Sequence, residues 1–258
     1  MSTFRVGVGR AARFRPSPVF VGIVALWLTG GVMAWLEYGS PVVNVLLFVL
    51  AGWIVSLSLH EYAHALTAYR SGDHSVAARG YLTLNPLTYT HPFLSIVLPL
   101  VFLLIGGIGL PGGAVWVNRG AVRSRGRASL ISLVGPGANV VFLLVLALPF
   151  LVGVDAQARP TFWAAVAFLA FLQLTAAVLN LLPVPGLDGG NAVRPWLRGD
   201  TAKLYDYLAP FGFVLLLVVI FTPVTRDLFW GVVLGAADLL GVPRGLIAHG
   251  LDLVQFWR

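Results

Sequence analysis

The run His60-Glu61-Tyr62-Ala63-His64 holds the side chains of this chain that are best suited to chemistry. Two histidines four positions apart lie on the same face of a helix, so both imidazoles can reach one metal ion. The glutamate after the first histidine lies where it can contact a water at that metal. The pattern H-E-x-x-H therefore predicts a metal site with His60 and His64 as ligands and Glu61 beside a metal-bound water.

The motif stands at the end of an apolar stretch, because residues 42–59 contain no charged side chain. Ionisable groups inside a membrane span are costly to bury and are functional by default. In the alternative interpretation, His60, Glu61 and His64 are structural polar groups that face the inside of a helix bundle. A bound divalent cation offsets much of the burial cost, so the membrane setting favours the metal site.

A catalytic zinc takes three protein ligands and leaves one position to water, so a third ligand is needed. The chain has no cysteine, which restricts the choice to His, Asp and Glu. Nothing in the sequence fixes the depth of His74, His91 or His249, and we interpret each as a solvated or interfacial histidine. Asp188 is the better candidate, because it follows a later apolar segment at the membrane level expected for the motif. On spacing alone, a ligand role for Asp188 and a turn role beside Gly189 are equally acceptable.

The composition indicates a membrane protein. Hydrophobic residues make up 58% of the 258 residues and charged residues only 10%, against roughly 25% charged residues in soluble domains. Several apolar runs of about 18 or more residues predict an all-α, polytopic membrane protein. The net charge of +7 can indicate a nucleic-acid partner, but basic cytoplasmic loops account for it more simply. We therefore expect no nucleic-acid partner.

The apolar runs predict about six transmembrane helices, at 18–36, 42–69, 128–152, 161–182, 204–222 and 228–242. A re-entrant or kinked hairpin is expected around 93–117, because a single crossing there would put the arginines that follow it on the outer side. With this topology, all lysines and arginines except Arg159 and Arg226 are cytoplasmic, and the motif lies in the cytoplasmic half of the second span. The expected organisation is a basic cytoplasmic N-terminus (1–17), one membrane-embedded domain (18–243) and a cytoplasmic C-terminal tail (244–258).

Three motifs in order along the chain carry a resemblance to a known family. They are HEYAH at 60–64, GPGAN at 135–139 and NLLPVPGLDGG at 180–190. Together they resemble the site-2 protease family, which is peptidase family M50 of intramembrane zinc metalloproteases, and within it the compact members without a PDZ or CBS domain. The resemblance implies one catalytic zinc ion held by His60, His64 and Asp188, with Glu61 as the catalytic acid and base.

The resemblance also implies roles for two asparagines. Asn180 matches the family's asparagine associated with substrate or transition-state contact, and Asn139 matches a polar position near the active site. Two positions depart from the family pattern without touching a ligand. Gly186 replaces a proline that is often present before the L-D-G motif, and His91 stands where an acidic residue is common.

The activity implied is regulated intramembrane proteolysis in a bacterial plasma membrane. The partner would be a single-span membrane protein, such as a membrane-tethered transcriptional regulator or an anti-sigma factor. Two other functions are compatible with intramembrane His, Asp and Glu residues. One is an intramembrane metal-ion transporter, which would need further polar residues toward the outer face. The other is an inactive relative that only binds membrane proteins, although all four residues needed for the chemistry are present.

Overall fold

The computed structural model describes residues 15–88, 101, 104 and 115–258. Most of the hairpin expected around 93–117 and most of the basic N-terminus therefore lie outside the described residues. Helices without any strand make up the regular structure of the described part. Five of its helices are long and apolar enough to cross a membrane, or six if the bent pair at the C-terminal end forms one more span. The prediction of an all-α polytopic membrane protein is confirmed.

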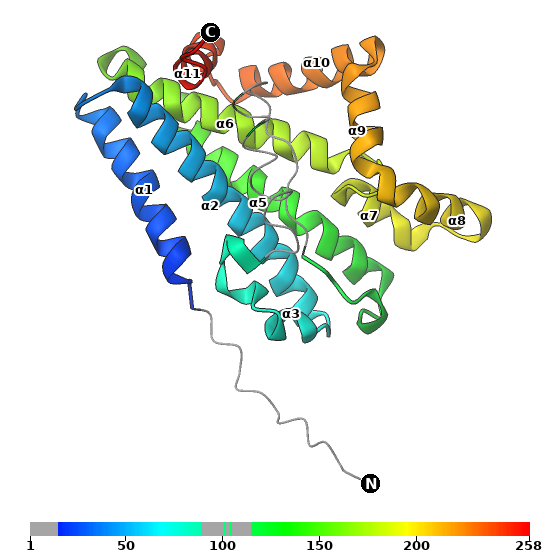
Figure 1. The fold of residues 1–258 in the computed structure, drawn as a ribbon. Helices are drawn as coiled ribbons and strands as arrows, with labels where there is room; N and C mark the ends of the chain where they lie inside the picture. The colour runs from blue at the N-terminus through cyan, green and yellow to red at the C-terminus, as the bar shows by residue number, and fades with distance from the viewer. Residues whose placement is uncertain (1–14, 89–100, 102–103, 105–114) are drawn as a thin grey trace.

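Four long helices lie side by side and form the body of the bundle (Figure 1). They are α1 (Pro18–Trp35), α2 (Pro41–Arg70), α5 (Arg125–Leu151) and α6 (Pro160–Leu181). Each coincides with an expected span to within a few residues. Three of them begin with proline, which is favoured at the first helical position because its missing N–H has no partner there anyway and its φ angle is already helical.

Helix α6 is the centre of the bundle. Of its most apolar window, 83% of the residues are buried, against 17% for the peripheral α1. Alanine recurs along α6, and small residues let helices approach closely in a membrane, where packing rather than water exclusion holds them together. Large side chains such as Phe168, Leu169 and Leu172 fill the remaining space without any solvent exposure. This packing fixes the positions of α2 and α5 relative to α6.

Short helices lie around this body. After α2 come α3 (Ser75–Ala78) and the 3-10 turns η1 (Tyr81–Thr83) and η2 (Pro86–Thr88), and η4 (Arg119–Ala121) precedes α5. The turn η5 (Ala156–Ala158) joins α5 to α6, and α7 (Asp188–Val193) with η6 (Arg194–Trp196) follows α6. The Asp206 carboxylate hydrogen-bonds the Arg194 guanidinium and thereby raises its pKa above its ordinary value. This ion pair fastens η6 to the next helix.

The C-terminal part departs from two simple spans. The fifth span is composed of α8 (Gly199–Leu208), η7 (Ala209–Phe211) and α9 (Gly212–Phe221). The sixth begins as α10 (Pro223–Leu239) but is followed at a bend of 114° by α11 (Arg244–Val254). Residues 244–258, expected as a tail, thus contain a helix that packs on α6, where a Cβ on Gly250 would lie 2.4 Å from the Ala164 carbonyl oxygen. A short helix with only one apolar face has no span-like signal in the sequence.

Candidate metal centre and active site

The H-E-x-x-H residues lie on the buried side of α2, more than halfway along the helix. His60, Glu61 and His64 are 6%, 2% and 7% exposed. The Nε2 atoms of the two histidines are 3.0 Å apart, as expected for residues one helical turn apart on one face. The helix alone therefore brings two imidazole nitrogens to one point.

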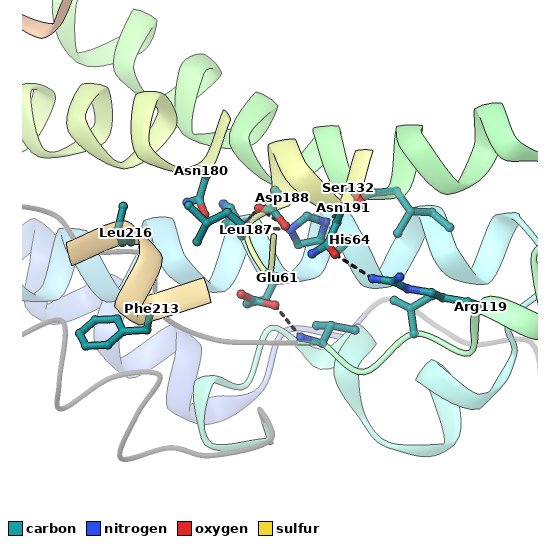
Figure 2. Close-up of a pocket in the computed structure, with 15 residues that line it drawn as sticks. Glu61, His64, Arg119, Ser132, Asn180, Leu187, Asp188, Asn191, Phe213 and Leu216 are labelled. Carbon is teal, nitrogen blue, oxygen red and sulfur yellow. Dashed lines mark hydrogen bonds and ion pairs between the residues drawn. The ribbon is translucent and has the colours of Figure 1, made fainter. Parts of the chain in front are cut away.

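Asp188 reaches the same point from another part of the chain. It is the first residue of α7, and its Oδ2 atom lies 3.2 Å from Nε2 of His60 and 3.3 Å from Nε2 of His64. Figure 2 shows the Asp188 carboxylate directed at the His64 ring. The three potential ligand atoms lie within 4.8 Å of one another. Of the two interpretations that the sequence leaves open, the structure agrees with the position of a third ligand.

Glycines in the connection between α6 and α7 allow this placement. Gly186 has a φ angle of +92°, a conformation in which residues with a Cβ are strained. Gly190 packs against the backbone so closely that a Cβ there would lie 2.0 Å from the Val184 carbonyl oxygen. The chain can therefore turn sharply after α6 and direct Asp188 back toward α2.

Hydrogen bonds fix the orientation of both imidazoles. Nδ1 of His60 lies 2.6 Å from Oδ1 of Asn139, and Nδ1 of His64 lies 2.5 Å from the Ile131 carbonyl oxygen. Because these oxygens only accept, each Nδ1 carries the proton and each Nε2 keeps a lone pair. Two such nitrogens and a carboxylate oxygen form a donor set that suits zinc. The residues present thus fit a zinc ion.

Helix α5 comes unusually close to this centre at Gly135. A Cβ on Gly135 would lie 2.2 Å from Nε2 of His64 and 2.7 Å from Nε2 of His60. No side chain fits at that position without displacing the ring atoms that face the metal site. The first glycine of the GPGAN motif is therefore required by the close approach of α5 to the histidines.

The centre opens into a cavity of about 310 Å³. Glu61 lines this cavity, and its Oε2 atom accepts a hydrogen bond of 3.0 Å from the Val115 N–H (Figure 2). Phe213 and Leu216 from α9 contribute an apolar part of the lining. A carboxylate, the potential ligands and an apolar wall thus share one cavity between the helices.

Segment 115–119 lies across one side of this cavity and is tied at two further points. The Asn118 N–H donates to Oδ2 of the buried Asp73 at 2.7 Å, and Nη2 of Arg119 donates to Oδ1 of Asn191 at 2.8 Å. Asn191 is on α7, three residues after Asp188. The segment thus connects the loop after α2 with the helix that supplies the third candidate ligand.

The two asparagines singled out by the sequence have different positions. Asn180, in the last turn of α6, lines the cavity, and no hydrogen bond to its side chain is found within the described residues. Asn139 lies behind His60, outside the cavity lining, and its amide group is bonded to His60, Ser56 and Gln173. Asn180 thus faces the cavity, whereas Asn139 contacts His60 from outside the cavity.

The other histidines lie apart from the centre. His74 packs edge-on against Tyr69, His249 is exposed on α11, and His91 lies outside the described residues. The sequence did not single out Ser56 and Gln173, or Arg119 and Asn191, although a glutamine in the middle of an apolar span is a recognisable signal.

Comparisons with known proteins find one family and several relatives that this chain resembles. The model of the family "Peptidase family M50" matches residues 147–219. The zinc metalloprotease named Rip2 from Mycobacterium tuberculosis is 48% identical over 253 residues, which cover 96% of this chain and 97% of that protein. The Rip2 protein of Mycolicibacterium smegmatis is 44% identical over 94% of this chain and 95% of its own length. The zinc metalloprotease named YwhC from Bacillus subtilis is 30% identical over 69% of this chain and 81% of its own length. No solved structure matches the chain.

Proposed function

Since the chain belongs to peptidase family M50, the site-2 protease family, we propose that this zinc metalloprotease cleaves peptide bonds within the transmembrane segments of other membrane proteins. One observation carries the proposal. The H-E-x-x-H residues of α2 and Asp188 of α7 converge within a bundle whose helices are long and apolar enough to span a membrane. A hydrolytic centre at such a place meets a transmembrane substrate before any soluble one.

In this proposal His60, His64 and Asp188 hold the zinc ion. Zinc bound there supplies a Lewis acid that polarises the scissile carbonyl group and makes a water molecule acidic near neutral pH. Glu61 takes the proton of that water and later delivers it to the leaving amine. The Val115 N–H donates a hydrogen bond to Oε2 of Glu61 and so holds this carboxylate at the cavity wall.

The two asparagines take separate roles. Asn180, directed into the cavity from α6, donates a hydrogen bond to the oxyanion that develops on the scissile carbonyl, an effect typically worth about 3 kcal/mol. Asn139 is a positioning residue that accepts the Nδ1 proton of His60. Only the first of these contacts changes as the substrate reacts.

The substrate we propose is a single-span membrane protein, such as a membrane-tethered transcriptional regulator or an anti-sigma factor. A helix hides its peptide groups in internal hydrogen bonds, so its cleavage site must unwind before attack. The apolar lining from α9 suits the side chains of such a segment, and the polar groups of Glu61 and Asn180 suit its freed backbone.

We further propose that the N-terminus and the active site are on the cytoplasmic side of a bacterial plasma membrane. The C-terminal helix α11 packs beside the start of α6, at the opposite end of the bundle from Asp188, because a Cβ on Gly250 would lie 2.4 Å from the Ala164 carbonyl oxygen. The expectation of a cytoplasmic C-terminal tail is therefore not part of the proposal. The support is the charge distribution before α8, because Arg159 is the only basic residue of that part of the sequence that this topology puts on the outer side. The cysteine-free chain allows single-cysteine labelling of intact cells with a membrane-impermeant maleimide. We expect labelling of an Arg159→Cys variant and protection of an Arg198→Cys variant. The reverse pattern would show that the orientation is inverted.

The experiment that tests the proteolytic function replaces Glu61 by Gln and measures both zinc content and cleavage of a single-span substrate in liposomes. The chain contains one other glutamate, the exposed Glu37, so Glu37→Gln is a matched control. We expect the Glu61→Gln variant to retain zinc and lose cleavage, and the control to retain both. Cleavage by the Glu61→Gln variant at the wild-type rate would refute the mechanism, and zinc transport into the liposomes without cleavage would support a transporter instead.

A further inference from the structure

Three polar side chains meet in the apolar interior of the bundle, immediately behind His60. Ser56 comes from α2, Asn139 from α5 and Gln173 from the middle of α6, and they are 2%, 4% and 0% exposed. None of the three lines the cavity that contains Glu61. Buried polar groups in a membrane are expensive and mark function, yet a place outside the cavity rules out contact with a substrate there. Their role has to act through another residue.

The hydrogen bonds between them form a connected set. Nδ2 of Asn139 donates to Oγ of Ser56 at 3.0 Å and to Oε1 of Gln173 at 2.9 Å. Oγ of Ser56 in turn donates to Oε1 of Gln173. On the other side, Oδ1 of Asn139 is 2.6 Å from Nδ1 of His60. Both amide hydrogens of Asn139 are therefore used on the side away from the metal site.

The orientation of the Asn139 amide decides which nitrogen of His60 carries the proton. With Oδ1 toward His60, Nδ1 must donate, and Nε2 keeps the lone pair that a metal ligand needs. In the opposite orientation the NH₂ group would face Nδ1, which would then have to accept. The proton would sit on Nε2, and His60 could not bind zinc.

The acceptor provided by Gln173 selects between these two orientations. Its Oε1 atom receives hydrogen bonds from Asn139 and from Ser56, and an oxygen there is compatible only with the NH₂ group of Asn139. The Nε2 atom of Gln173 is buried and has no hydrogen-bond partner within the described residues. Gln173 thus contributes to this cluster through its oxygen.

We propose that Gln173 and Ser56 are positioning residues of the metal centre, which hold Asn139 with its oxygen toward His60 and so keep Nε2 of His60 available for zinc. The inference rests on the proposed function insofar as His60 is taken to be a zinc ligand. Partners that orient ligating imidazoles typically change metal affinity by about 10-fold to 100-fold when removed. Here the effect would be transmitted through two hydrogen bonds.

The test measures zinc affinity of the full-length protein in detergent or nanodiscs by competition with a chromogenic chelator. Gln173→Leu removes the acceptor, Ser56→Ala removes one donor to it, and Gln173→Glu keeps oxygen acceptors at the same place. Asn44→Leu is the matched control, because Asn44 is a buried amide on α2 whose side chain donates a hydrogen bond to the Tyr38 carbonyl group, away from the metal centre. We expect zinc affinity to fall by about 10-fold to 100-fold in Gln173→Leu, to fall less in Ser56→Ala, and to be retained in Gln173→Glu and Asn44→Leu.

A second readout distinguishes positioning from a general effect on packing. ¹⁵N spectra of histidine-labelled, zinc-free protein report the tautomer of His60, assigned by comparison with a His60→Ala variant. We expect the Nδ1-protonated form in the wild type and a mixture of tautomers in Gln173→Leu. Excess zinc should restore cleavage in Gln173→Leu, because the residues that react are intact.

The outcomes separate this inference from the proposed function. If His60→Ala binds zinc as tightly as the wild type, the ligand assignment of the proposed function is wrong. If His60→Ala loses zinc but Gln173→Leu keeps the wild-type affinity and the wild-type tautomer, the metal site stands and the positioning role of Gln173 is refuted.

Discussion

A substitution of Gly135 by alanine provides the sharpest test of the geometry at the metal centre. The added Cβ would lie 2.2 Å from Nε2 and 2.5 Å from Cε1 of His64, and 2.7 Å from Nε2 of His60. Carbon atoms in ordinary contact are about 3.5–4.0 Å apart. The His64 ring would therefore have to move away from α5 by roughly 1 Å or more. The hydrogen bond from its Nδ1 to the Ile131 carbonyl group opposes that movement.

The size of the effect differs between metal binding and stability. Metal–ligand distances tolerate deviations of about 0.2 Å, which the required displacement exceeds several-fold. We therefore expect zinc affinity to fall by at least about 100-fold, or about 2.8 kcal/mol. The crowding itself costs about 1–3 kcal/mol of stability, but alanine gains about 0.5–1 kcal/mol over glycine in a helix. The fold should thus survive with a modest loss.

Gly137 supplies the matched control, since it lies on the same helix two residues away and a Cβ there would meet no atom within 4 Å. The assay compares zinc affinity by chelator competition and thermal unfolding of the two variants with and without zinc. Gly137→Ala should bind zinc like the wild type and unfold at the same or a slightly higher temperature. Zinc affinity of Gly135→Ala equal to that of Gly137→Ala would refute the close approach of α5 to the two histidines.

Two further substitutions test other parts of the site. Asn180→Ala should lower kcat by roughly 10²-fold to 10³-fold with zinc content unchanged, because the lost hydrogen bond forms only in the transition state. An unchanged kcat in the liposome cleavage assay would contradict a role of Asn180 at the oxyanion. Asp73→Ala removes the acceptor for the Asn118 N–H and should cost about 1–3 kcal/mol in unfolding free energy and raise KM, because the segment across the cavity loosens. Asp155→Ala is its control, since Asp155 accepts a turn hydrogen bond from the residue two positions on, as Asp73 does from Ser75, but lies on an exposed loop. Equal effects of the two variants on KM would argue against the coupling of Asp73 to the cavity.

Much of the fold could be predicted from local patterns in the sequence. Apolar runs of span length predicted α1, α2, α5 and α6 to within a few residues, because a membrane requires long uninterrupted hydrophobic helices. The spacing of His60 and His64 predicted that both rings reach one point, since it depends only on the geometry of one helix. The C-terminal bend escaped prediction, because α11 is short and its packing on α6 depends on close contact at Gly250.

The rest of the site depends on contacts between helices that are distant in the sequence. Asp188 remained either a ligand or a turn residue on spacing alone, and the distinction rests on how α7 packs beside α2. Gly135 carries no chemistry of its own, so its role is visible only once a missing Cβ is set against the histidine rings. Which atom of the Asn139 amide faces His60 depends on hydrogen bonds between three helices. A pattern in the sequence does not contain that information.

The interhelical contacts also imply that the metal centre exists only in the packed bundle. His60 is oriented by Asn139 on α5, His64 by the Ile131 carbonyl group on α5, and Asp188 arrives from the end of α6. In an apolar interior these polar groups find partners only when α2, α5 and α6 are in register, and each unpaired group raises the free energy of other packings. A cation held by all three ligands favours the same register, because its binding stabilises only the state in which they converge. The polar core therefore specifies one arrangement of the helices, although their apolar surfaces alone would be compatible with several arrangements.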